Sequence, residues 1–311
     1  MFALSLFLAA LAAGCNACSS VLQRKANLTK SDDQRRLTVK TAGRVLRRPA
    51  WLFGFVAMLV SFGLQAVALD VGQLSAVEPV LAIELPLTLL VAARVFGHGL
   101  AVRDWLGIIG MTVGLAALIG ALDPSEGSAA HVSGMTWLVA TSATVAPIAA
   151  LWLCALRFRG GPRSALFGVA AGAGFGLTAS MIKAAVDALS SGGLDALVTT
   201  WQMYAVAVSG VISVWLVQNA LHSGALVAAQ PGITLLDPIV AVLWGVLVYR
   251  ETVNHGPAII VAVTGIVLMA VSVFILARAQ ALDSRSDAAS KSRRGHSDHT
   301  RHRAPARATR R

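Results

Sequence analysis

Long apolar runs of about 20 residues are the feature that most limits what this chain can fold into. As a helix rising 1.5 Å per residue, such a run crosses a hydrocarbon layer of ~30 Å. Hydrophobic residues make up 56% of the sequence and charged residues 13%, which is too apolar for a soluble domain of this length. The runs lack the alternating pattern of barrel strands, so we predict an all-α integral membrane protein. The nine predicted spans cover residues 2–21, 51–69, 74–95, 105–121, 135–156, 164–188, 201–221, 225–249 and 258–279.

One stretch of the third span recurs in the eighth span, at an offset of 152 residues. Each copy carries two prolines seven residues apart and an acid one or two residues before the second proline. A proline removes a helix hydrogen bond and leaves a carbonyl free, so we predict a helix break in each copy. The first copy holds Pro79, Glu84 and Pro86, and the second holds Pro231, Asp237 and Pro238.

The offset predicts two similar blocks of four helices. The first block covers residues 1–121 and includes a basic loop at 22–50, and the second covers 164–279. A single connector helix at 135–156 joins them, so the blocks are expected to run in opposite directions across the bilayer. This 4+1+4 inverted repeat is typical of carriers that work by alternating access.

The distribution of positive charge predicts the orientation. With the amino terminus outside, 24 of the 26 Lys and Arg residues fall on the other side of the membrane. The positive-inside bias therefore predicts a protein of the plasma (inner) membrane with a cytoplasmic carboxyl terminus. The loop at 22–50 and the tail at 280–311, which we expect to be disordered, would face anionic lipid headgroups. This distribution favours a lipid surface over nucleic acid as the partner of the basic residues.

The first span has two interpretations. Its sequence from Leu11 to Cys15 resembles a lipoprotein cleavage site, and cleavage there would remove the helix. However, no positive residue precedes the apolar run, as a signal peptide requires. We therefore favour a retained helix, and cleavage stays open as the alternative.

Two acids lie near the middle of their predicted spans. A charged carboxylate there costs at least ~2.5 kcal/mol, so Glu84 and Asp237 should face the protein interior or water. We predict that they bind the substrate or a coupling ion. The alternative is a protonated acid that is hydrogen-bonded to a neighbouring helix.

Other polar residues within the spans are further candidates for the same cavity. They are Gln65, Gln218 and Asn219, with Asn16 as a weaker candidate, and packing between helices is the alternative role. Lys183 and Asp187 are four residues apart in one helix, so we predict a structural or gating ion pair, which Glu78 could join.

No motif for catalysis, a cofactor or ATP binding is present in the sequence, and we do not expect an enzyme. No ligand set for a metal can be assigned from the sequence.

The doubled block, the prolines of the third helix and two sequence phrases resemble the drug/metabolite transporter superfamily. The phrases run from Arg94 to Gly107 and from Val248 to Thr252. EamA-type members carry Gly-Glu at this place; here Glu251 keeps the acid, while the first block has Gly97 and His98. Nine spans and Ser19–Lys25 also resemble the NIPA-type branch, which implies magnesium transport.

The sequence therefore predicts a carrier of a small metabolite or ion, with proton coupling as one mechanism. A divalent-cation transporter is the first alternative, and a membrane scaffold that does not transport is the second. The substrate, the direction of transport and the formation of a homodimer stay open.

Overall fold

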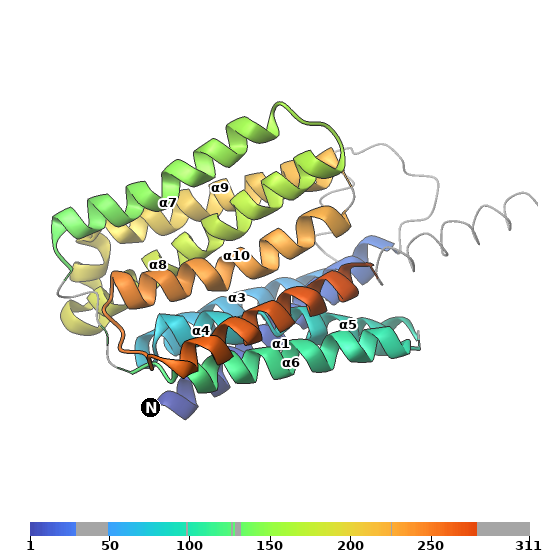
Figure 1. Cartoon of the computed structure of the whole chain (residues 1–311), viewed down its shortest axis with the longest axis horizontal. Helices are drawn as coiled ribbons and strands as arrows, with labels where there is room; N and C mark the ends of the chain where they lie inside the picture. The colour runs from blue at the N-terminus through green and yellow to red at the C-terminus, as the bar shows by residue number, and fades with distance from the viewer. Residues whose placement is uncertain (29–48, 98, 126, 128–131, 225, 279–311) are drawn as a thin grey trace, which may run out of the picture.

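A computed structural model describes residues 1–28, 49–97, 99–125, 127, 132–224 and 226–278, and it shows a bundle of long helices (Figure 1). Residues 29–48 of the basic loop predicted at 22–50, together with His98 and the tail at 280–311, lie outside the described residues, and residues 22–28 of that predicted loop instead continue the first helix. The helices are α1 (Phe2–Leu28), α3 (Pro49–Val71), α4 (Leu74–Leu81), α5 (Glu84–Phe96), α6 (Val102–Leu122), α7 (Gly134–Ala155), α8 (Gly161–Thr199), α9 (Trp201–Ser223) and α10 (Leu226–Leu247), followed by a helix over Pro257–Arg278.

In the part of the chain that the structure describes, nine helical segments are long and apolar enough to cross a membrane, with α4 and α5 counted together. This confirms the predicted all-α membrane protein. Large apolar side chains such as Phe53, Val211 and Ile260 point away from the bundle and are highly exposed. Such a surface is suited to a hydrocarbon solvent rather than to water.

Helix α8 is the centre of the bundle and packs against α3, α4, α7, α9 and α10. Glycines spaced four residues apart let α10 approach α8 closely, as small residues do between membrane helices. A Cβ atom added to Gly168, Gly172 or Gly176 would lie 2.4–2.6 Å from a backbone oxygen of α10, those of Ala229, Gly232 and Asp237 respectively.

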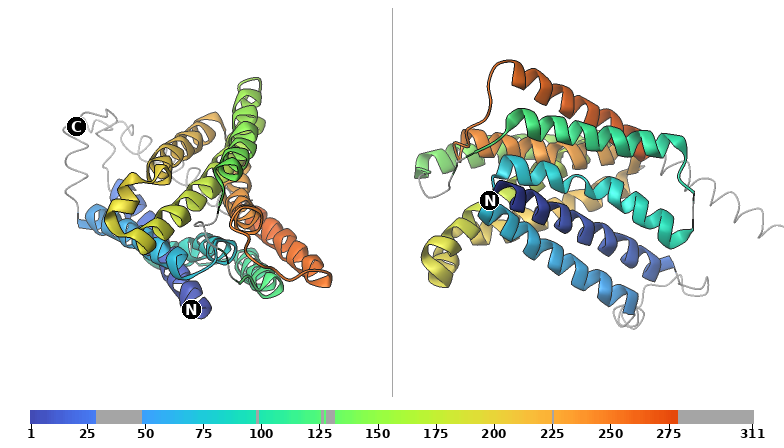
Figure 2. Two further views of the ribbon diagram at one scale, coloured as in Figure 1. Left: turned by 90° about the vertical axis from the view of Figure 1, so that its left-hand side faces the viewer. Right: turned by 90° about the horizontal axis from the view of Figure 1, so that it is seen from below.

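Helix α8 extends past the predicted end of its span, from residue 188 to Thr199. The extension contains a kink at Gly193, whose φ of 70° and ψ of −163° are accessible to glycine but not to other residues. Beyond the kink the helix turns away from the bundle (Figure 2), and most of its side chains are exposed.

The first helices form a second group, in which α1 packs against α3, α4 and α5. Helix α6 packs instead against the helix Pro257–Arg278. A Cβ at Gly114 would lie 2.7 Å from the carbonyl oxygen of Gly265, so the two backbones are in direct contact there.

The two proline stretches differ in structure. In the first, α4 ends at Leu81 and α5 begins at Glu84, and the amides of Ala82 and Ile83 donate to carbonyls three residues back. In the second, α10 continues through both Pro231 and Pro238. The break expected in both copies is thus present only in the first, and the second copy is held as one helix along the glycine face of α8.

Candidate functional site

Glu84 is the first residue of α5, immediately after the break. The positive end of a helix dipole favours a carboxylate at this position. The Nδ2 atom of Asn16 in α1 donates to Glu84 Oε2 over 2.7 Å. Glu84 is half-buried in the structure, so the break and α1 together hold a carboxylate inside the helix bundle.

Glu78 lies in α4, about one and a half turns before Glu84, and is buried. The Nε2 atom of Gln65 in α3 donates to Glu78 Oε1 over 2.9 Å. The sequence allowed Glu78 to join the Lys183–Asp187 pair, but in the structure its carboxyl group bonds to Gln65 of the preceding helix. Gln65 thus lies beside one of the acids, and its role in a binding site stays a prediction.

Asp237 approaches these two acids from α10, which packs against α4. It lies within electrostatic range of both Glu78 and Glu84. Its Oδ1 atom is buried and has no hydrogen-bond partner among the described residues. An unsatisfied buried oxygen costs free energy, so Asp237 is the acid of this group with a free acceptor for a proton or a ligand.

The polar residues predicted on α9 do not join this group. Asn219 donates from Nδ2 to the Trp215 carbonyl of its own helix over 2.8 Å. Gln218 is exposed. The related residue in the first half, Gln65, is therefore the one that the fold brings to an acid.

Lys183 and Asp187 form the predicted pair on α8, with 3.1 Å between Nζ and Oδ1. Lys183 is buried, and its Nζ atom also donates to the carbonyls of Leu69 and Gly72 over 2.6 and 3.2 Å. Leu69 lies in the last turn of α3 and Gly72 directly follows that helix, so the lysine joins α8 to the end of α3.

Glu251, in the segment after α10, reaches the other side of the turn that joins α3 to α4. Its carboxylate accepts hydrogen bonds from the backbone amides of Leu74 and Ser75 and from the Ser75 hydroxyl. Burial raises the pKa of Glu251 above its usual range, while the bonds from Ser75 and Leu74 and the charge of Lys183 partly offset that rise. The sequence pointed to Glu251 only through the family resemblance.

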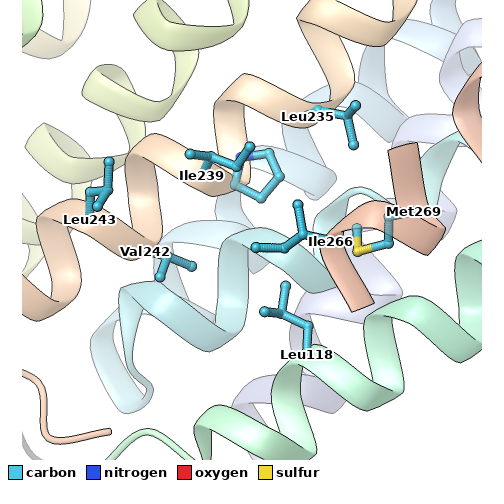
Figure 3. A pocket seen from close by; sticks show the side chains of 8 residues that line it. Leu118, Leu235, Ile239, Val242, Leu243, Ile266 and Met269 are labelled. Carbon is cyan, nitrogen blue, oxygen red and sulfur yellow. The ribbon is translucent and has the colours of Figure 1, made fainter. Parts of the chain in front are cut away.

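An apolar hollow of about 130 Å³ lies between α6, α10 and the helix Pro257–Arg278 (Figure 3). Leu118, Leu235, Ile239 and Met269 are among its lining residues, and Pro238 contributes its ring. None of the three acids lines the hollow, so it is separate from the acid group.

Comparisons with known proteins give one informative relative. The uncharacterized protein Cgl0250/cg0304 of Corynebacterium glutamicum is 30% identical to this chain over 208 residues, which are 66% of this chain and 71% of the relative. The chain belongs to the same family as that protein. No family profile matches the chain, and no solved structure matches it.

In the part of the chain that the structure describes, no group of three His, Cys, Asp or Glu side chains is arranged to hold a metal ion. The three acids instead interact with amide side chains or with one another over longer distances.

Proposed function

We propose that this protein is a multi-pass carrier that moves a small solute through the bundle by alternating access. Glu78, Glu84 and Asp237 are its binding and coupling acids. The observation that carries the proposal is Asp237, whose buried Oδ1 has no hydrogen-bond partner in the described part of the chain although Glu78 and Glu84 lie within electrostatic range. Three acids at the depth of the membrane helices are costly, which is why such residues usually mark an ion or substrate path.

The arrangement of the two halves supports an inverted repeat as the basis of this motion. α1 packs against α3, α4 and α5, and α8 packs against α9 and α10, as the offset of 152 residues relates these helices. The acids come from both groups, so a rocking movement of one group against the other would change which side of the membrane they face. The resemblance to the drug/metabolite transporter superfamily is in line with this proposal.

Transport by the purified full chain in sealed vesicles tests the proposal. Vesicles containing a pH-sensitive dye would be given a gradient of Mg²⁺ alone, tetraethylammonium alone or an amino-acid mixture. We expect a flux with at least one of these probes, and a loss of roughly tenfold or more in Glu84→Gln and Asp237→Asn, because each variant removes a charged group from the site.

Asp104→Asn is the matched control. Asp104 is also a buried acid whose Oδ1 has no hydrogen-bond partner among the described residues, but it lies outside the site, in the first turn of α6, where its Oδ2 accepts from the Ala101 amide over 2.8 Å. Flux that responds equally to all three variants, or to none, contradicts the assigned role of the acids. If Mg²⁺ is the one probe that crosses the membrane, the divalent-cation alternative is supported. If the function of the protein depends only on residues 284–311, the scaffold alternative is supported.

A further inference from the structure

The end of α3, the short turn that follows it and the start of α4 form what we call the α3–α4 corner (residues 69–75). Buried charged side chains bind this corner on both sides. The base, Lys183, comes from α8, and the acid, Glu251, comes from the segment after α10. The corner itself belongs to the other group of helices, with α1, α3, α4 and α5. These contacts therefore cross between the two groups that the proposed carrier moves apart.

On the first side of the corner, the base meets the negative end of a helix. The last carbonyls of α3 have no partner within their own helix. Lys183 Nζ donates to the Leu69 and Gly72 carbonyls, and this places a positive charge where the dipole of α3 is negative. Asp187 holds the same ammonium group from one turn further along α8.

On the second side, the acid completes the cap of α4. The first four amides of a helix need acceptors outside it. The amides of Ala76 and Val77 donate to the Gln73 carbonyl over 3.2 and 3.0 Å, and the Gln73 side chain forms no cap. The amides of Leu74 and Ser75 donate to Glu251 over 2.7 and 3.0 Å. The cap of this eight-residue helix is therefore supplied from 177 residues away.

The end of α10 directs Glu251 to this place. Arg250 has a left-handed φ of 57°, which turns the chain back, and the Glu251 amide donates to the Gly245 carbonyl over 2.9 Å. A Cβ at Gly245 would lie 2.3 Å from Glu251 Oε2, so an alanine here would displace the carboxylate from its present position. The position of the acid is thus built into the packing of the second group.

We propose that Lys183 and Glu251 form a latch that closes the side of the molecule where the α3–α4 corner lies. The inference rests on the proposed carrier function, because opening this side requires the two groups to separate at the latch. All residues from Leu74 to Val80, Glu78 among them, are buried in the latched structure. Releasing both caps frees the corner and exposes the acid site to that side.

The test measures how fast a buried cysteine behind the latch reacts with a membrane-impermeant maleimide applied to one side at a time. Val77→Cys is the reporter, because Val77 is fully buried in the first turn of α4. It is introduced into the full chain with Cys15, Cys18 and Cys154 changed to alanine. We expect labelling from the corner side to be roughly tenfold faster with Glu251→Ala or Lys183→Met, because each variant removes charged hydrogen bonds.

Two further variants keep the test decisive if Glu251→Ala does not fold. Gly245→Ala displaces the carboxylate and should also speed labelling. Glu251→Gln keeps only one of the two acceptor oxygens that receive the Leu74 and Ser75 hydrogen bonds, so it should speed labelling less than Glu251→Ala. Asp104→Ala is the control, because it removes a helix cap within a single loop. Unchanged labelling in Lys183→Met and Gly245→Ala, or an equal increase in Asp104→Ala, overturns the latch.

Labelling does not require transport, so the latch and the carrier function can fail separately. If flux is lost in Glu84→Gln but the labelling rate is unchanged in Lys183→Met, the carrier function is supported and the latch is rejected. If the latch variants label faster but no probe crosses the membrane, the latch is supported as a closing contact and the carrier function is rejected.

Discussion

The stretch from Glu78 to Pro86 and its counterpart from Gln230 to Pro238 share their proline spacing, but their structures differ. The first is split into α4 and α5, and its acids Glu78 and Glu84 receive hydrogen bonds from Gln65 and Asn16. The second is one helix, and its acid Asp237 has a buried oxygen without a hydrogen-bond partner among the residues that the structure describes. The same pattern of prolines thus gives a break or a continuous helix, depending on what packs beside it.

The neighbours of each stretch account for the difference. α10 lies along the glycines of α8 over its length, and this close contact stabilises the helix on both sides of each proline. α4 and α5 pack mainly against α1 and α10, and the cap of α4 comes from Glu251. In the first stretch, side chains hold the acids, whereas in the second, backbone packing holds the helix and leaves the acid free.

The largest expected effect breaks the backbone contact in the second stretch. In Gly172→Ala the new Cβ would lie 2.4 Å from the Gly232 carbonyl oxygen, which is backbone and cannot move aside without shifting α10. We expect a loss of about 2–3 kcal/mol, measured as a lower thermal unfolding midpoint in detergent.

The control for this prediction is Gly120→Ala in α6, where a Cβ would have no neighbour within 4 Å. We expect that variant to be neutral or more stable by up to ~1 kcal/mol, as alanine is in a helix interior. Equal midpoints for the two variants would mean that the contact does not hold α10 in place.

An effect of intermediate size sharpens the contrast between the acids. Asn16→Ala removes the donor to Glu84 and should lower stability by about 1–3 kcal/mol, because it leaves a half-buried carboxylate without this bond. Asp237→Asn removes an acid that already lacks a partner at Oδ1, so its unfolding midpoint should stay the same or rise. A larger loss in Asp237→Asn than in Asn16→Ala would reverse the comparison.

The smallest expected effect concerns the cap on α4. The pKa of Glu251 is raised by burial, so the folded protein binds its proton more tightly than the unfolded chain. The stabilising contribution of this group is complete below the ordinary glutamate pKa of 4.5 and is lost as the pH rises through the raised pKa. The unfolding midpoint of the unaltered protein relative to Glu251→Gln should therefore fall as the pH rises above the ordinary glutamate pKa of 4.5.

Other ionisable groups near Glu251 are present both in the unaltered protein and in the Glu251→Gln variant. Lys183, Asp187 and Tyr249 face the same region, and their contribution cancels when the difference between the two midpoints is plotted. A difference that grows with pH would show that the hydrogen bonds and Lys183 outweigh burial at this carboxylate.

Local features of the fold were predictable because they depend on residues close in sequence. The nine apolar runs agree with the observed helices to within a few residues at most ends, and the Lys183–Asp187 pair follows from its four-residue spacing. The break between α4 and α5 was also expected from the prolines. The continuity of α10 was not, because it depends on the glycines of a neighbouring helix.

Contacts between distant segments were beyond prediction from periodicity. Glu78 was a possible third member of the Lys183–Asp187 pair and instead accepts from Gln65. Gln218 was a candidate for the cavity, with helix packing as the alternative, and its side chain is exposed. A residue's depth in the membrane follows from its position in a run, but the direction of its side chain depends on the neighbouring helices. The direction of a side chain is therefore not determined by the apolar run that contains it.

The sequence by itself determined that this chain is a bundle of membrane-length helices with acids at mid-depth, because the lengths of apolar runs and the cost of exposing backbone in lipid allow no other fold. Only the tertiary structure decided which polar groups meet: Asn16 with Glu84, Gln65 with Glu78, and Glu251 with the first amides of α4. Hydrogen bonds act over about 3 Å, so these partners are specified only when the helices pack in three dimensions.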